Sequence, residues 1–131
     1  MTHSQTLALT VGYPARSIAV LTVVGEIDVE SVPVLRTRAL GLIRQGRPHL
    51  VLDMAAVEFC DSAGLNAMIT ILRYAKDRHG SLSLAALSPQ VARLLDVTGV
   101  GDLIPVLPTT AEVLTRITAT PGDAPEEAEL P

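Results

Sequence analysis

The chain has 131 residues, which is enough for one domain with a buried core and too few for two. Apolar residues make up 48%, but the only aromatic residues are Tyr13, Phe59 and Tyr74, so the stacking platforms that bind single-stranded nucleic acid are absent. Ten Lys and Arg oppose fourteen Asp and Glu, and four of these acids lie in the last nine residues. The rest of the chain is therefore neutral, which suits neither nucleic acid nor an anionic membrane.

A single cysteine and the lack of targeting signals indicate a soluble cytoplasmic protein. Cys60 can form no intrachain disulfide, which favours a reducing compartment. A lone cysteine at such a position is typically packed and unreactive. The N-terminus shows no basic stretch followed by an apolar run, so no signal peptide is expected. The longest apolar stretch, residues 18–24, is too short to cross a bilayer.

A hairpin and a helix are expected in the first part of the chain. Alternating apolar residues over 7–11 and β-branched residues over 17–24 predict two strands, joined by an irregular turn over 14–16. Residues 25–28 are expected to leave the second strand as a loop. A helix that starts near Ser31 follows this loop.

A buried strand and the longest helix come next. Residues 50–54 are apolar almost throughout, as in a central strand that is covered on both faces. Helical spacing of apolar residues then runs from Leu65 through Leu72, and Gly80 sits where a C-terminal cap belongs.

The last part of the domain predicts a strand, a helix, a short strand and a final helix. Residues 81–86 alternate as a strand does, and Ser88 caps a shorter helix that stops by Gly99. Residues 103–107 predict a short strand that a proline weakens. Residues 109–112 have the sequence of a capping box, which opens the last helix.

Strands that alternate with helices predict an α/β fold in a single domain over residues 7–118. The sheet is expected to be mixed and largely parallel, with four to five strands and about four helices packed on it. Residues 1–6 are expected to form a flexible N-terminus. Residues 119–131 are acidic and rich in Pro, Ala and Glu, which predicts a disordered tail.

Asp61 and Ser62 stand at the junction between the buried strand and the longest helix. Either residue would serve as the N-cap, because both side chains carry an oxygen that accepts from the first free N–H groups. A hydroxyl here lies at the positive end of the helix dipole, where the fold tolerates a phosphate. The capping preference alone favours an ordinary cap.

Two separated motifs, Gly25-Glu26-Ile27-Asp28 and Asp61-Ser62-Ala63-Gly64-Leu65, carry a resemblance to a known family. They resemble the signature of STAS domains, and more narrowly that of the bacterial anti-sigma factor antagonists. The resemblance covers about residues 7–118 and implies a STAS domain there. Many family members have Ser or Thr where this chain has Ala63, so any role of a second hydroxyl is lost.

The resemblance also implies a partner-switching mechanism in transcription regulation. In the family, a kinase that is also the anti-sigma factor phosphorylates the serine directly after the motif's Asp, and that serine is Ser62 here. The unphosphorylated protein would bind the anti-sigma factor and free a sigma factor. Phosphorylation would release the protein, and a phosphoserine phosphatase would reset the switch. The expected partner-binding residues are Asp28, Asp61, Ser62, Ala63, Gly64, Leu65 and Asn66.

Gly64 has two readings at this position. A helix start without a side chain would let a partner's backbone approach closely. The same glycine would equally be one that a first turn merely tolerates.

No catalytic, metal or cofactor site is expected. The sequence shows no nucleophile elbow, no dinucleotide fingerprint and no phosphate-binding loop. The carboxylates of Asp28, Asp53 and Asp61 are expected to gather at one sheet edge, but acid–base catalysis also needs a concave pocket. No two histidines have the spacing of metal ligands; the histidines are His3, His49 and His79.

Three alternatives stay open. The first is a STAS scaffold in a signalling or transport complex that meets no kinase, with Ser62 acting only as a cap. The second is a module that binds a nucleotide or another small ligand at the corner of Asp28 and Ser62. The third is a hydrolase without a recognisable motif.

Overall fold

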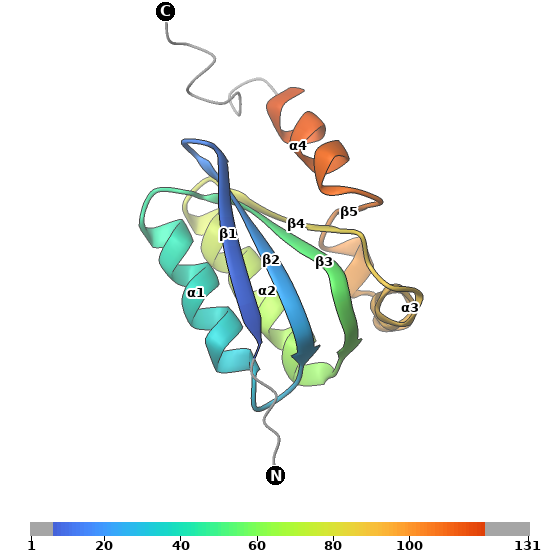
Figure 1. The fold of residues 1–131 in the computed structure, drawn as a ribbon. Coiled ribbons are helices and arrows are strands. Elements are labelled where there is room, and N and C mark those ends of the chain that lie inside the picture. Colours follow the sequence, from blue (N-terminus) through green and yellow to red (C-terminus); the bar gives the residue numbers. More distant parts are fainter. Residues whose placement is uncertain (1–6, 120–131) are drawn as a thin grey trace, which may run out of the picture.

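The computed structural model describes residues 7–119, and Figure 1 shows one twisted sheet with helices on both faces. The strands are β1 Ala8–Ala15, β2 Ile18–Ile27, β3 His49–Cys60, β4 Ser81–Ala85 and β5 Val106–Leu107. The helices are α1 Val32–Arg44, α2 Ser62–Asp77, α3 Pro89–Thr98 and α4 Thr110–Ala119, with a 3₁₀ turn over Val100–Asp102. The strand order is β1-β2-β3-β4-β5, with β1 antiparallel to β2 and every other pair parallel. The predicted mixed, largely parallel α/β fold is confirmed.

The sheet separates two apolar cores of unequal size. The larger core lies between the sheet and helices α1, α2 and α3, and it includes Leu35, Leu52 and Met68. The smaller core lies under α4 on the other face, where Val113 and Ile117 pack on Ile18 and Val51. Leu50, Val51 and Leu52 are all fully buried, so the middle strand is covered on both faces as its sequence predicted.

Strands β1 and β2 are both longer than the sequence indicated. Residues 12–14 continue β1 through a bulge, so the turn of the hairpin narrows to residues 16–17. Gly25, Glu26 and Ile27 were expected in a loop, but they pair in parallel with β3. Gly25 has a φ of 124°, a backbone conformation that glycine adopts without strain. The register of the pairing between β2 and β3 shifts between Gly25 and Glu26, and β2 continues beyond this shift to Ile27.

Strand β3 also runs six residues beyond the predicted 50–54, as far as Cys60. Its first part, up to Asp53, pairs with β4, whereas its second part pairs with β2 alone. Because β2 and β3 lengthen together, their ends form a two-stranded extension beyond the rest of the sheet. The short strand expected over 103–107 reduces to two residues, Val106–Leu107.

The end of α2 differs from the prediction. The left-handed residue after α2 is His79, with a φ of 61°, and not Gly80. Gly80 instead packs against Pro48; these two residues directly precede β4 and β3, respectively. The Gly80 N–H donates to the Ala75 carbonyl oxygen. The glycine is therefore needed for close packing between two chain segments rather than for its backbone freedom.

The expectations for the two chain ends fall mostly outside the described residues. α4 includes Ala119, so the first residue of the expected tail is helical. The predictions of a flexible segment over 1–6 and a disordered tail over 120–131 concern residues that the structure does not describe.

Replacing Gly80 by alanine is expected to destabilise the fold. The added Cβ would overlap the Pro48 carbonyl oxygen, which belongs to the backbone and cannot rotate away. We expect Gly80→Ala to lower the free energy of unfolding by about 1–3 kcal/mol, measured by urea denaturation. Gly12→Ala is the matched control, because nothing lies within 4 Å of its added Cβ. Equal stability of the two variants would contradict the packing role.

Candidate functional site

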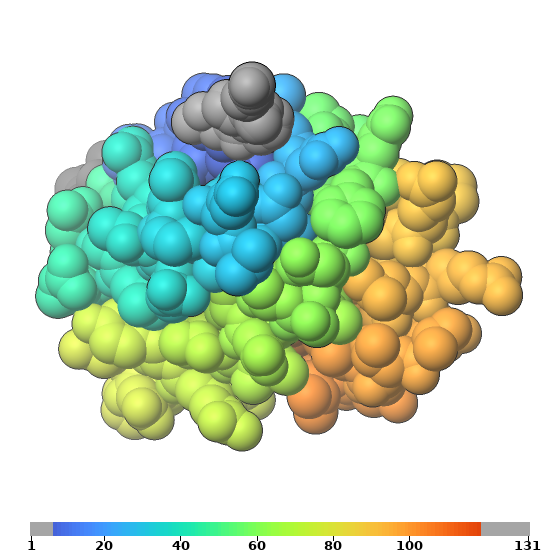
Figure 2. All heavy atoms as spheres, turned by 90° about the horizontal axis from the view of Figure 1, so that it is seen from below, coloured from blue at the N-terminus to red at the C-terminus, as the bar shows by residue number. Residues whose placement is uncertain are grey.

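The carboxyl ends of β2 and β3 bring the two sequence motifs together. Ile27 pairs with Cys60, and the backbone N–H of Asp61 donates to the Ile27 carbonyl oxygen over 3.1 Å. The turn before α1 and the first turn of α2 therefore lie side by side. Figure 2 shows this end of the molecule, where the light blue loop after β2 meets the green end of β3 and start of α2.

Of the two N-cap candidates, Asp61 and Ser62, it is Asp61 that caps α2. Its Oδ1 accepts from the N–H groups of Ala63 at 2.9 Å and Gly64 at 3.2 Å. Its backbone is extended, with φ −104° and ψ −170°, as N-caps usually are. Ser62 is then the first residue of the helix and is exposed. Its hydroxyl is therefore not required to cap the helix.

Asp28 holds the shape of its own loop. Its Oδ1 accepts from the N–H groups of Glu30 at 3.0 Å and Ser31 at 2.9 Å. In return, the Ser31 hydroxyl accepts from the Asp28 N–H at 3.0 Å and donates to the Glu26 carbonyl oxygen at 2.7 Å. Sequence reasoning placed Ser31 only as a helix start and missed this role. The Asp-x-x-Ser spacing was the available signal, since both side chains cap backbone N–H groups three residues away.

Gly64 provides space for this chain's own side chains. It is buried, and an added Cβ would lie 2.5 Å from Cys60 Sγ and 2.7 Å from Ile27 Cγ2. The lack of a Cβ at Gly64 therefore serves packing within the chain, because β2 and β3 occupy the space beside it. Leu65 is likewise buried at 7% exposure. Asn66 is exposed, and Ala63 is half-buried beside Ser62.

Cys60 is a packing residue. Its side chain is buried, and burial, with a smaller contribution from the nearby Asp61 carboxylate, raises the pKa of its thiol to about 12. A thiol with this pKa is almost fully protonated at neutral pH, and the thiolate is the nucleophilic form. Cys60 is therefore unsuited to covalent chemistry.

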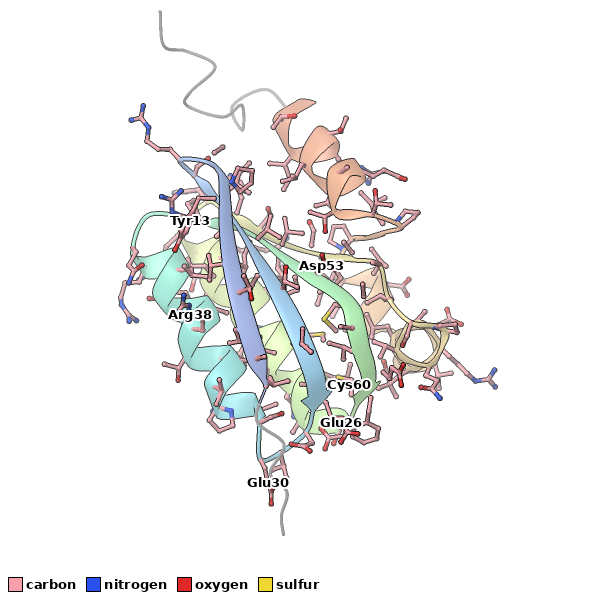
Figure 3. All side chains as sticks on the ribbon, viewed as in Figure 1. Tyr13, Glu26, Glu30, Arg38, Asp53 and Cys60 are labelled. Carbon is pink, nitrogen blue, oxygen red and sulfur yellow. The ribbon has the colours of Figure 1, made fainter. Side chains whose placement is uncertain are left out.

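The face around Ser62 is acidic. Figure 3 places Glu26 and Glu30 at the same lower end of the sheet as Cys60. The neighbouring Glu58 is exposed, and Phe59 beside it exposes 47% of its surface. The Ser62 hydroxyl therefore stands among carboxylates and one exposed aromatic ring.

Asp53 does not belong to this face. It pairs with Thr22 and Ala85 in the middle of the sheet, and its Oδ1 accepts from the Ala55 N–H at 3.1 Å. Figure 3 shows it well above Cys60 along β3. The expectation that Asp28, Asp53 and Asp61 gather at one edge is therefore wrong for Asp53. The extension of β3 by six residues separates it from the other two.

Within residues 7–119, no group of three or more His, Cys, Asp or Glu side chains is arranged to hold a metal ion. His49 is buried, and its Nδ1 lies 2.9 Å from the Oγ of Ser81. None of the helices in this part of the chain is long and apolar enough to cross a membrane.

Comparison with known proteins identifies the family of this domain. The model of the STAS domain family matches residues 14–113, and the chain belongs to that family. It is 38% identical over 86 residues to the anti-sigma-B factor antagonist of Bacillus subtilis (strain 168), a match that covers 66% of this chain and 78% of the relative.

Solved structures support the same fold. The unphosphorylated anti-sigma factor antagonist SpoIIAA superposes with a TM-score of 0.75 at 23% identity, over 86% of this chain and 98% of that chain. The phosphorylated form of SpoIIAA from Bacillus gives a TM-score of 0.67 at 22% identity, over 84% of this chain and 99% of that chain. The resemblance inferred from the two motifs is confirmed.

The cap can be tested separately from any signalling role. Asp61→Ala removes the acceptor for the N–H groups of Ala63 and Gly64, and we expect it to lower the free energy of unfolding by about 1 kcal/mol. Asp61→Asn keeps an oxygen in the same place and should lose much less. Urea denaturation measures both. An equal loss in both variants would mean that the charge matters more than the hydrogen bonds.

The thiol of Cys60 gives a second test. We expect it to resist alkylation in the native protein at pH 8 and to react at once in urea. Its pKa in the folded protein is about 12, above the reference value of 9.0, so the native state keeps the thiol proton at pH values between the two. That contribution to stability is complete below pH 9 and is lost as the pH rises toward 12. Above pH 9, stability should fall more steeply for the wild type than for Cys60→Ala; parallel curves would contradict this.

Proposed function

We propose that this protein is an anti-sigma factor antagonist that is switched by phosphorylation of Ser62. The observation that carries the proposal is an exposed hydroxyl on the first residue of α2, in a chain 38% identical to an anti-sigma-B factor antagonist. Because Asp61 caps the helix, the Ser62 side chain is available for modification.

The unphosphorylated protein binds its anti-sigma factor through the face around Ser62. Ser62 and Asn66 present exposed polar groups there, and the half-buried Asp28, Asp61 and Ala63 border them. Gly64 and Leu65, which are buried, contribute by fixing α2 against the ends of β2 and β3. Binding sequesters the anti-sigma factor and so frees a sigma factor for transcription.

Phosphorylation releases the complex by electrostatic repulsion. A phosphoserine carries about −1.5 to −2 charges near neutral pH. Against a partner carboxylate at ~6 Å and an effective dielectric constant of about 20, each unit of charge costs about 3 kcal/mol. Each unit of charge therefore corresponds to about two decades of affinity, and the whole phosphate costs at least that much.

The fold itself tolerates the phosphate. An anion at a helix N-terminus gains about 0.3–1 kcal/mol from the helix dipole. The Asp61 carboxylate already occupies the N–H groups of Ala63 and Gly64 and repels the phosphate, so the two effects oppose each other. The complex is therefore more sensitive to phosphorylation than the domain.

The proposal assigns the chemistry to partners and only binding to this chain. The anti-sigma factor is the serine kinase that modifies Ser62, and a phosphoserine phosphatase removes the phosphate. These partners act in the cytoplasm, where sigma factors meet RNA polymerase. The protein itself is not an enzyme and carries no cofactor in this mechanism.

The decisive experiment traps the partner and then asks it to act. Ser62→Ala cannot accept phosphate, so it should retain its anti-sigma factor when recovered from native cells. That partner, given ATP, should add one phosphate to Ser62 of the wild type, as intact mass and site mapping would show. The phosphorylated form should bind it at least about 100-fold more weakly, measured by calorimetry.

Thr70→Ala is the matched control, because Thr70 is an exposed hydroxyl on the same helix. This variant should be phosphorylated and released like the wild type. An unmodified Ser62 in every growth condition, or equal affinity of both forms, would overturn the switch. The protein would then be a STAS module that binds its partner constitutively.

A further inference from the structure

A groove runs between the edge strand β1 and helix α1, and its apolar end lies next to the loop that carries Asp28 and Glu30. One part has a volume of about 560 Å³ and is lined by Leu7, Leu9, Pro33, Val34, Thr37 and Arg38. A second part, of about 400 Å³, shares Thr37 and Arg38 and continues to Tyr13 and Arg44. We call the two parts together the α1 groove. Figure 3 shows Tyr13 and Arg38 along this side of the molecule.

The α1 groove changes from apolar to basic along its length. α1 carries Arg36, Arg38 and Arg44 and no acidic residue, and β1 carries no acidic residue either. At the basic end, the Arg47 guanidinium lies 4.1 Å from the centre of the Tyr13 ring. At the other end, apolar side chains of β1 and α1 line the groove. Its walls therefore present positive charge without internal neutralisation, next to an apolar surface.

The chain itself contains a segment with the complementary pattern. Residues 120–131 lie outside the described range and include four acids, Asp123, Glu126, Glu127 and Glu129, followed by Leu130. Leu130 is the single large apolar residue among them. The order along the chain, acids first and leucine near the end, matches a path from the basic end of the groove to its apolar end.

We propose that residues 120–131 bind in the α1 groove of the same molecule. Their carboxylates would meet Arg44 and Arg38, and Leu130 would lie near Leu7 and Val34. The proposal is independent of the phosphorylation switch, because it uses none of the residues assigned to that switch. It replaces the expectation of a solvated tail with a specific, charge-dependent contact.

The position of α4 places the start of residues 120–131 near the basic end of the α1 groove. Ile117, near the end of α4, packs in the same apolar cluster as Ala15 of the β1–β2 hairpin. The Ala15 carbonyl oxygen in turn accepts from Arg47 at 2.8 Å, beside the Tyr13 end of the groove. Figure 1 shows α4 and this hairpin at the same end of the molecule.

The segment is also long enough. Twelve residues span up to about 40 Å when extended, whereas a helix of the length of α1 is about 20 Å long. Exposed ion pairs are individually weak, so binding depends on several of them acting together. Attachment to the same chain adds a high effective concentration. We therefore expect a contact that salt weakens strongly, because exposed charges are screened within about 3 Å at 1 M salt.

The test is a spin label in the full-length chain. Ala128→Cys places one reactive thiol in the segment, and the buried Cys60 stays unlabelled, which intact mass verifies. The amide signals of Thr37 and Gly41 in α1, and of Gln45 directly after it, should lose more than half of their NMR intensity. The signals of Thr98, at the end of α3, and of Gly101, in the 3₁₀ turn after it, should be retained.

Charge variants and mixing complete the test. The pair Arg38→Gln and Arg44→Gln should restore the α1 signals, as should high salt, whereas Arg93→Gln on α3 should leave them broadened. Retained α1 signals in the wild type would overturn the proposal, and so would broadening that survives the paired substitution. Broadening that arises only between spin-labelled molecules and separate ¹⁵N-labelled ones would assign the groove to a second copy, which also overturns it.

Discussion

The close approach of α2 to the ends of β2 and β3 is the constraint on which the Ser62 face depends. Only a residue without a Cβ fits at position 64, because Cys60 and Ile27 fill the space beside it. The hydrogen bond from the Asp61 N–H to the Ile27 carbonyl oxygen then fixes the two loops to each other. A larger residue at position 64 would move the helix, and the acidic loop and the exposed serine would lose their relative placement.

Asp61 and Ser62 have different roles at the junction between β3 and α2. Asp61 satisfies the free N–H groups of the helix, and Ser62 presents its hydroxyl to solvent. Because Asp61 makes the capping hydrogen bonds, a change to the Ser62 hydroxyl leaves them in place. The order Asp-Ser therefore suits a site at which a covalent change must alter binding without unfolding the domain.

The sequence predicted the order and type of the elements because apolar periodicity and capping residues are local signals. It underestimated the lengths of β2 and β3 because Gly25 and the Ala55-Ala56 pair are poor strand formers. Only the pairing between β2 and β3 keeps these residues within the strands. The same error placed Asp53 near the site. The role of Gly64 stayed open because a sequence does not reveal which side chains fill the space beside a glycine.

The reciprocal bonds between Asp28 and Ser31 have a consequence for the speed and cost of recognition. Loops that carry binding residues usually lose conformational entropy when a partner orders them. Here the loop is already tied at both ends by its own side chains, and Ser31 is 4% exposed. Little ordering remains to be done on association. A partner that bound here would meet a rigid surface, and the charge of a phosphate would change its affinity without any competing rearrangement.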